Sequence, residues 1–151
     1  MSAGEGKQSI EPILRFVFDG FEKDALAAIA ARFGESAVSE LRFSTTIVGA
    51  ESNEQEGEAR RDRIRLANLY TFSTFLMDRE CWDQAITAHD WTIRLSEDLK
   101  EPYFLEDSRF QKAFCYKKLD LRAELAREKQ MIAPDATCFI EGRRMGIKDL
   151  D

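Results

Sequence analysis

Cysteine, histidine, glycine and proline are all scarce in this sequence of 151 residues. Three cysteines cannot pair completely as disulfides, and a single histidine leaves little material for metal binding or acid–base catalysis. With only eight glycines and three prolines, neither a small loop-rich scaffold nor a many-turned β-sandwich is expected. The sequence contains no C-x-x-C pair and no His/Cys cluster, so we expect no metal and no cofactor.

Long hydrophobic runs are also missing. The longest uninterrupted one extends from Ala25 to Ala31, far short of the roughly 20 residues that a membrane-spanning helix needs. Residues 1–8 are small and polar, without the apolar stretch of a signal peptide, and are expected to form a flexible leader. The absence of both kinds of segment predicts a cytoplasmic protein that does not bind membranes. The odd number and wide spacing of the cysteines agree with this, because they suit a reducing compartment.

The composition nevertheless supports a packed core. Hydrophobic residues make up 44% of the chain and charged residues 33%, a balance that is typical of one folded domain and not of a disordered chain. The formal net charge of −6 argues against a general nucleic-acid binder. We therefore expect a single domain over residues 9–151.

The first part of that domain, residues 9–49, has the pattern of short helices. Ser9 is a candidate cap, Pro12 is tolerated in a first helical turn, and Gly34 is well placed to end an alanine-rich helix. At Asp19-Gly20, either a turn separates two short helices or one helix continues through a weak point. Residues 50–58 are acidic, lack bulky apolar side chains and are expected to be a linker.

Residues 59–134 show apolar spacing that predicts two successive helix pairs. The tail at residues 135–151 is ambiguous: Thr137 to Ile140 favours a strand, whereas Gly142 and Gly146 weaken a helix, so a small hairpin and a frayed short helix both remain open. The overall prediction is an all-α fold of about six to seven helices, stacked as α-α hairpins.

The two predicted helix pairs share a pattern of large and small residues. It comprises Leu69, Phe72, Ser73, Leu76, Trp82 and Ala85 in the first pair, and Phe110, Phe114, Leu121, Ala123 and Met131 in the second. This pattern resembles the tetratricopeptide repeat (TPR), a helical hairpin of about 34 residues. The chain also departs from that family: Ala85 and Ala123 lie 38 residues apart, Gln111 stands where a small residue is usual, and Pro102 lies late for a repeat end.

The resemblance implies a function as well as a fold. First helices of such repeats line a concave groove that receives peptides, and here that wall would carry Tyr70, Thr74, Met77, Ser108, Arg109, Lys112 and Tyr116. Arg109 and Lys112 would then hold a carboxylate of the bound segment, because both side chains donate hydrogen bonds to carboxylate oxygens. The alternative is that both cations are ordinary solvated helix charges.

Three functions follow from these patterns. The first is a protein–protein interaction module, an adaptor or scaffold that binds a peptide or protein segment in a helical groove. The second is a self-associating structural or regulatory protein, for example a homodimer, because few repeats leave apolar ends exposed. The third is an enzyme with a dispersed site around His89, but a lone histidine on an apolar face is typical of a core residue. We therefore expect no enzymatic activity.

Overall fold

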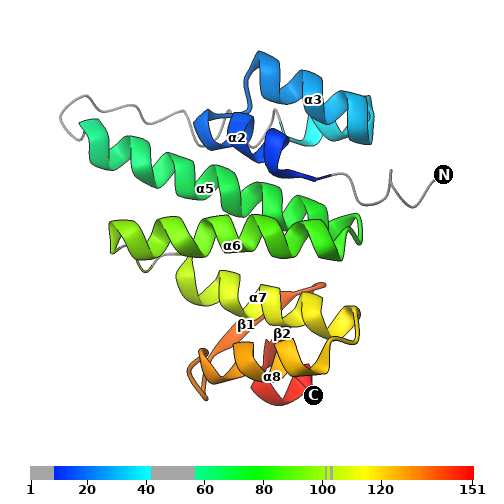
Figure 1. Ribbon diagram of the computed structural model, residues 1–151, viewed down its shortest axis with the longest axis vertical. Coiled ribbons are helices and arrows are strands. Elements are labelled where there is room, and N and C mark those ends of the chain that lie inside the picture. The colour runs from blue at the N-terminus through cyan, green and yellow to red at the C-terminus, as the bar shows by residue number, and fades with distance from the viewer. Residues whose placement is uncertain (1–8, 42–56, 101, 103) are drawn as a thin grey trace. The chain divides into compact units, whose positions relative to one another are not determined.

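The structure is a computed structural model that describes residues 9–41, 57–100, 102 and 104–151 (Figure 1). Its helices are α2 (Glu11–Asp19), α3 (Lys23–Phe33), α5 (Gly57–Asp78), α6 (Trp82–Leu99), α7 (Leu105–Lys118) and α8 (Arg122–Gln130), and residues 35–41 are helical too. Strands β1 (Thr137–Ile140) and β2 (Arg143–Gly146) and a short 3-10 helix, η1 (Ile147–Leu150), complete the described chain. The prediction of an all-α fold with about seven helices is confirmed for these residues.

The chain divides into two compact units, the first ending at Phe72 and the second beginning at Ser73, so that the boundary falls within α5. The predicted single domain over residues 9–151 stays a prediction. The predicted leader, residues 1–8, lies outside the described residues, as do residues 50–56 of the predicted linker. Gly57 and Glu58, assigned to the same linker, are already helical and begin α5.

The first unit follows the local signals of its sequence. Ser9 Oγ accepts a hydrogen bond from the backbone N–H of Glu11 at 3.1 Å, and Pro12 stands in the first turn of α2. Gly20 has a φ of 138° and ends the helix, so a turn separates α2 from α3. Gly34, with a φ of 97°, ends α3 as expected. Left-handed and other positive φ values cost glycine little, because it lacks a Cβ.

Aromatic packing anchors the core of the first unit. The ring of Phe72, on α5, lies 6.5 Å from that of Phe21 and 6.4 Å from that of Phe33. These separations are typical of tilted and edge-to-face pairs, which add specificity to hydrophobic burial. The largest fully buried aliphatic side chains of this unit come from three helices: Leu14, Val17, Ile29, Leu66 and Leu69.

Helix α7 is the central element of the second unit. It packs against α6, α8, β1 and η1 (Figure 1). Such a position explains why α7 is buried on more than one side, with Phe110, Ala113 and Cys115 inaccessible to solvent. Helix α8, by contrast, has no buried residue and covers only one flank of α7.

The ambiguous tail forms a β-hairpin, one of the two structures that the sequence left open. Strands β1 and β2 are antiparallel, with Cys138 opposite Met145. The two residues between them, Glu141 and Gly142, have φ values of 54° and 80°, the positive values that a type I′ turn needs. Alternate residues of β1 point in opposite directions, so that Cys138 is buried and Phe139 is exposed.

The turns between α5 and α6 and between α7 and α8 have the same geometry. Each places an acidic residue in the left-handed region, with a φ of 60° at Glu80 and 58° at Asp120. Each also closes its helix with the two backbone hydrogen bonds of a Schellman motif. These bonds run from Glu80 N to Met77 O, Cys81 N to Leu76 O, Asp120 N to Lys117 O and Leu121 N to Tyr116 O.

This shared turn corrects the alignment of the two helix pairs. Ala85 N donates to Cys81 O at 2.8 Å, and Leu125 N donates to Leu121 O at 2.9 Å, so Ala85 corresponds to Leu125. The expected equivalence of Ala85 and Ala123 is therefore wrong by two residues, since Ala123 is only the second residue of α8 and is exposed. The resemblance to the TPR family as such stays a prediction.

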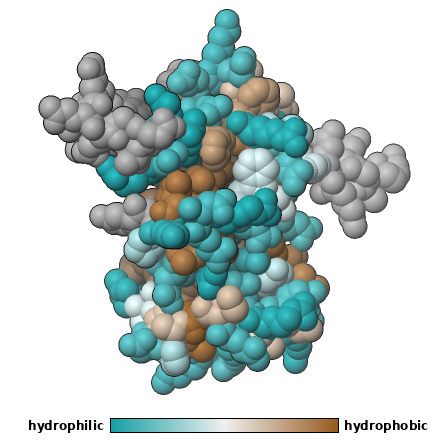
Figure 2. Space-filling model, turned by 60° about the vertical axis from the view of Figure 1, so that its left-hand side comes forward, coloured by the Kyte–Doolittle hydropathy of each residue, from teal (hydrophilic) through white to brown (hydrophobic). Residues whose placement is uncertain are grey.

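Hydrophilic residues cover most of the described surface on the face drawn in Figure 2, and hydrophobic residues reach it in patches. The large hydrophobic residues exposed in the described chain are Phe16, Leu121, Met131 and Phe139, and Phe139 is 61% accessible. No helix in the described segments combines the length and the apolar character that crossing a membrane requires.

Candidate functional site

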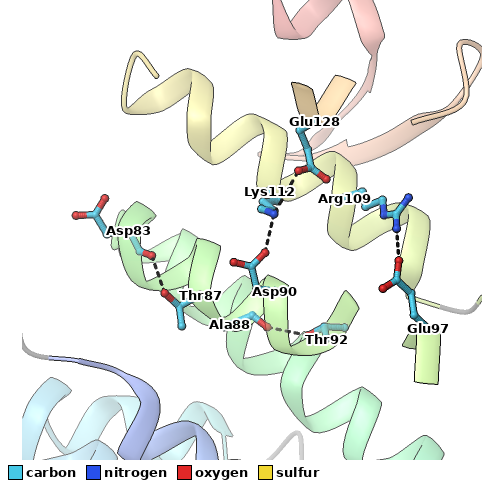
Figure 3. Close-up of polar contacts among 9 residues, drawn as sticks. All are labelled: Asp83, Thr87, Ala88, Asp90, Thr92, Glu97, Arg109, Lys112 and Glu128. Atoms are coloured by element: carbon cyan, nitrogen blue, oxygen red, sulfur yellow. Dashed lines mark hydrogen bonds and ion pairs between the residues drawn. The ribbon is translucent and has the colours of Figure 1, made fainter. Parts of the chain in front are cut away.

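Arg109 and Lys112, the proposed carboxylate clamp, take part in ion pairs between helices (Figure 3). Lys112 Nζ lies 2.6 Å from Asp90 Oδ1 on α6 and 3.2 Å from Glu128 Oε1 on α8. Arg109 pairs with Glu97 on α6, and its second terminal nitrogen lies 3.4 Å from the carbonyl oxygen of Met131. Both cations therefore link α7 to α6 and to the C-terminal end of α8 through contacts within the chain.

Burial and charge act in opposite directions on Lys112. Desolvation lowers the pKa of its ammonium, but the hydrogen bond to Asp90 and the charges of Asp90 and Glu128 raise it overall. The side chain of Lys112 is only 15% accessible, and that of Glu128 only 12%. A cation held in this way is well placed to stabilise the packing of three helices.

The other predicted groove residues lie in different surroundings. Ser108 is fully buried, and Tyr116 lines a groove beside α8. Tyr70 belongs to the first unit. Thr74 and Met77 line a pocket in the second unit, and they are the two predicted residues that the structure places in that pocket. The assignment of all seven residues to one peptide-binding groove stays a prediction.

His89 is completely buried on α6. Its Nε2 lies 3.3 Å from Met77 Sδ, and burial, together with the charge of Lys112, lowers its pKa to about 3. At neutral pH the imidazole is thus uncharged and is shielded from any solute. These surroundings match the expected core role of this histidine.

Two of the three thiols, those of Cys115 and Cys138, are similarly shielded. Burial raises the pKa of Cys115 to about 12, and burial is also the main reason that the pKa of Cys138 rises to about 11. All three cysteines are thiols rather than disulfides. Within the part of the chain that the structure describes, no three His, Cys, Asp or Glu side chains are grouped so that they could hold a metal ion.

A pocket of about 210 Å³ opens between the end of α5, α7 and the β-hairpin. Three aromatic residues from three different elements form its walls: Trp82 at the start of α6, Phe114 on α7 and Phe139 on β1. The Trp82 and Phe114 rings are 5.9 Å apart and nearly perpendicular, at 72°. Each ring therefore fixes the orientation of the other.

The rim of this pocket is acidic. Asp78, Glu80 and Glu141 line it, and none of its described lining residues is basic. Glu80 and Glu141 both stand in left-handed turns, where glycine or asparagine is the usual residue. The α5–α6 turn and the hairpin turn thus place carboxylates around an aromatic cavity.

Each aromatic wall already attracts a cation of the chain itself. The Lys118 ammonium lies 5.7 Å from the centre of the Trp82 ring and 5.3 Å from that of Phe114. The Arg144 guanidinium lies 5.9 Å from the centre of the Phe139 ring. All three distances fall within the range of about 6 Å over which a ring attracts a cation.

A second, larger groove of about 470 Å³ runs between the end of α7, α8 and the C-terminal residues. The chain's own C-terminus is fastened beside it: Lys117 Nζ donates to Asp149 O at 2.7 Å, and Lys129 pairs with Asp151. Leu150, also in this groove, is fully buried. Leu150 and Asp151 line this groove, whereas three aromatic side chains wall the smaller pocket, so the aromatic pocket is the stronger candidate for an external ligand.

A scan against protein-family models found no match, and searches of curated proteins and of solved structures found no similar chain. The candidate site is therefore defined by the geometry of the second unit.

Proposed function

We propose that this protein is an interaction module that binds a segment of a partner protein, and that the pocket walled by Trp82, Phe114 and Phe139 is its binding site. The observation that carries the proposal is the 61% accessibility of Phe139 at the edge of this pocket. Aromatic side chains that border a cavity and remain exposed are typical anchors of protein interfaces.

The size of the pocket supports a peptide rather than a metabolite as the ligand. Its volume of about 210 Å³ is below the ~300–1,000 Å³ of pockets that enclose a whole small molecule. A cavity of this size suits one side chain of a longer segment, with the rest of the segment lying on the surrounding surface.

The chemistry of the second unit supports binding rather than catalysis. His89 is buried and has a pKa of about 3, so it is a poor general base at neutral pH and cannot reach a substrate. The raised pKa values of Cys115 and Cys138 leave these thiols weakly nucleophilic. We also propose a cytoplasmic location, because the three cysteines form no disulfide.

Selection from a random peptide library tests the proposal. Peptides enriched on the wild-type protein should lose affinity by about ten-fold when Phe139→Ser removes the exposed ring, because a central aromatic contact is commonly worth more than ~1 kcal/mol. Phe16→Ser is the matched control, since Phe16 is an exposed phenylalanine of the first unit. Failure to enrich any peptide, or equal losses in both variants, would contradict the proposal.

Self-association is the second candidate function. The observation in its favour is that Met131 and Phe139 are 57% and 61% accessible within the same unit. If these side chains join two copies, light scattering at micromolar concentration should give twice the mass of one chain, and Phe139→Ser should return a single-chain mass. A wild-type protein of single-chain mass would exclude a stable homodimer.

A further inference from the structure

We infer that the aromatic pocket receives a cationic side chain, the lysine or arginine of a basic peptide segment. This inference rests on the proposed function and specifies the partner's chemistry. It combines three features of one cavity: its size, its acidic rim and its aromatic walls.

The acidic rim determines which charge on a ligand the pocket favours. Asp78, Glu80 and Glu141 contribute three carboxylates to a lining that holds no described basic residue. An anionic ligand would meet repulsion from all three, whereas an ammonium or guanidinium would be attracted by them. An uncharged apolar side chain would gain no electrostatic attraction from these carboxylates.

The walls favour a cation as well. Aromatic faces attract ammonium and guanidinium groups through the ring quadrupole, and tryptophan does so most strongly. The second unit demonstrates this preference, because Lys118 lies over Trp82 and Phe114 and Arg144 lies over Phe139. A partner's lysine or arginine would add the same contact from inside the cavity, where it would also face the carboxylates.

The two glutamates on the rim occupy costly positions. At Glu80 and Glu141, φ values of 60° and 54° place a Cβ-bearing residue where glycine would be less strained. Glycine or asparagine would suit both turns better if the turns served only to reverse the chain. Asp120 has a φ of 58° outside the pocket lining, so Glu80 and Glu141 are distinguished by their place beside the cavity and not by their backbone strain.

Lys118 gives the inference a second, opposite prediction. Its ammonium lies within 6 Å of two of the three ring centres and is not part of the pocket lining. A cation entering the pocket would be repelled by it. Removing this charge should therefore strengthen the binding of a basic ligand, whereas removing a rim carboxylate should weaken it.

The test uses octapeptides of serine and glycine with one central residue, which is arginine, lysine, norleucine or glutamate. A Trp91→Phe background leaves Trp82 as the chain's single tryptophan, so its fluorescence reports on the pocket. We expect saturable changes with the arginine and lysine peptides, weakening as salt rises, and no saturable change with the other two.

Variants then assign the effect to named groups. Glu80→Gln and Glu141→Gln should each weaken binding of the arginine peptide about two- to five-fold, as expected for exposed ion pairs. Lys118→Gln should strengthen it by a similar factor. Asp120→Asn is the matched control, because it removes a carboxylate from the equivalent turn, outside the pocket lining, and should change nothing.

The outcomes separate this inference from the proposed function. Equal binding of the norleucine and lysine peptides would overturn the cation assignment and leave a peptide-binding pocket. The cation assignment also fails if none of the four peptides binds while library-selected peptides do. If neither set binds, the proposed function fails together with the inference.

Discussion

Glu80 and Asp120 occupy equivalent positions in two turns of the same geometry, each with a φ close to 60° and each one residue before the N-cap of the next helix. They differ in surroundings: Glu80 lines the aromatic pocket, and Asp120 lines the groove beside α8. The pair therefore offers a matched comparison in which backbone strain is shared and the proposed function is not.

Substitution by glycine should separate stability from binding at these two positions. Both Glu80→Gly and Asp120→Gly should raise the free energy of unfolding by about 0.5–1 kcal/mol, because relief of left-handed strain exceeds the extra freedom of the unfolded chain. Only Glu80→Gly should weaken peptide binding. Urea denaturation and fluorescence titration measure the two effects, and equal loss of binding in both variants would contradict the assignment.

Lys112 should contribute to stability rather than to binding. Lys112→Met leaves the carboxylates of Asp90 and Glu128 without their shared cation, and the free energy of unfolding should fall by about 1–2 kcal/mol. Arg122→Met is the control, because Arg122 pairs with Asp120 at the surface and should contribute less than ~0.5 kcal/mol. Equal urea midpoints for the two variants would show that the buried pairing stabilises nothing.

Burial of His89 should make stability depend on pH. The pKa of the folded state is about 3 and that of an unfolded histidine about 6.5, so the unfolded chain binds a proton first as pH falls. The contribution of neutral His89 is present above pH ~6.5 and is lost as pH decreases towards 3, at up to ~1.4 kcal/mol per pH unit.

His89→Gln removes this titration and leaves the carboxylates in place. The free energy of unfolding should therefore fall more steeply from pH 7 to pH 5 in the wild type than in the variant. Parallel pH profiles would show that His89 titrates alike in both states. That result would be incompatible with its burial.

Reactivity of the thiols should follow their exposure. Cys81 is partly accessible, whereas Cys115 and Cys138 are buried and have raised pKa values. Iodoacetamide should therefore modify Cys81 in the folded protein and the other two only after denaturation, as read by peptide mass spectrometry. Rapid labelling of Cys138 in the folded protein would mean that the hairpin opens readily.

Local signals in the sequence predict much of the fold. Pro12 and Gly34 mark helix boundaries through their own backbone preferences, and these boundaries are found in the structure. At Gly20 the sequence leaves a turn and a continuous helix open, and the structure has the turn. The sequence leaves the hairpin open because Gly142 both weakens a helix and suits a tight turn. The side chains of Cys138 and Ile140 are buried in the second unit, and this burial favours the strand. A short stretch of sequence carries no information about such long-range packing.

The candidate site is harder to predict from the sequence than the fold is. The spacing of Arg109 and Lys112 on one helix face suggests a groove, but their ion-pair partners come from α6 and α8. The sequence pattern assigns Trp82 and Phe114 to repeat positions. Their place in a pocket depends on Phe139, a strand residue that only tertiary packing brings beside them. The signal that the sequence offers is Glu141 directly before Gly142, a pair that suits the turn of a hairpin, which is one of the two structures left open for this segment.

Amide NMR of the protein titrated with a library-selected peptide tests the central claim most directly. We expect the indole N–H signal of Trp82 and the backbone signals of residues 139–141 to move together and to saturate, while the indole signal of Trp91 stays in place. Movement confined to Tyr116, Leu121 and Leu125 would instead locate binding in the groove beside α8 and contradict the assignment of the aromatic pocket.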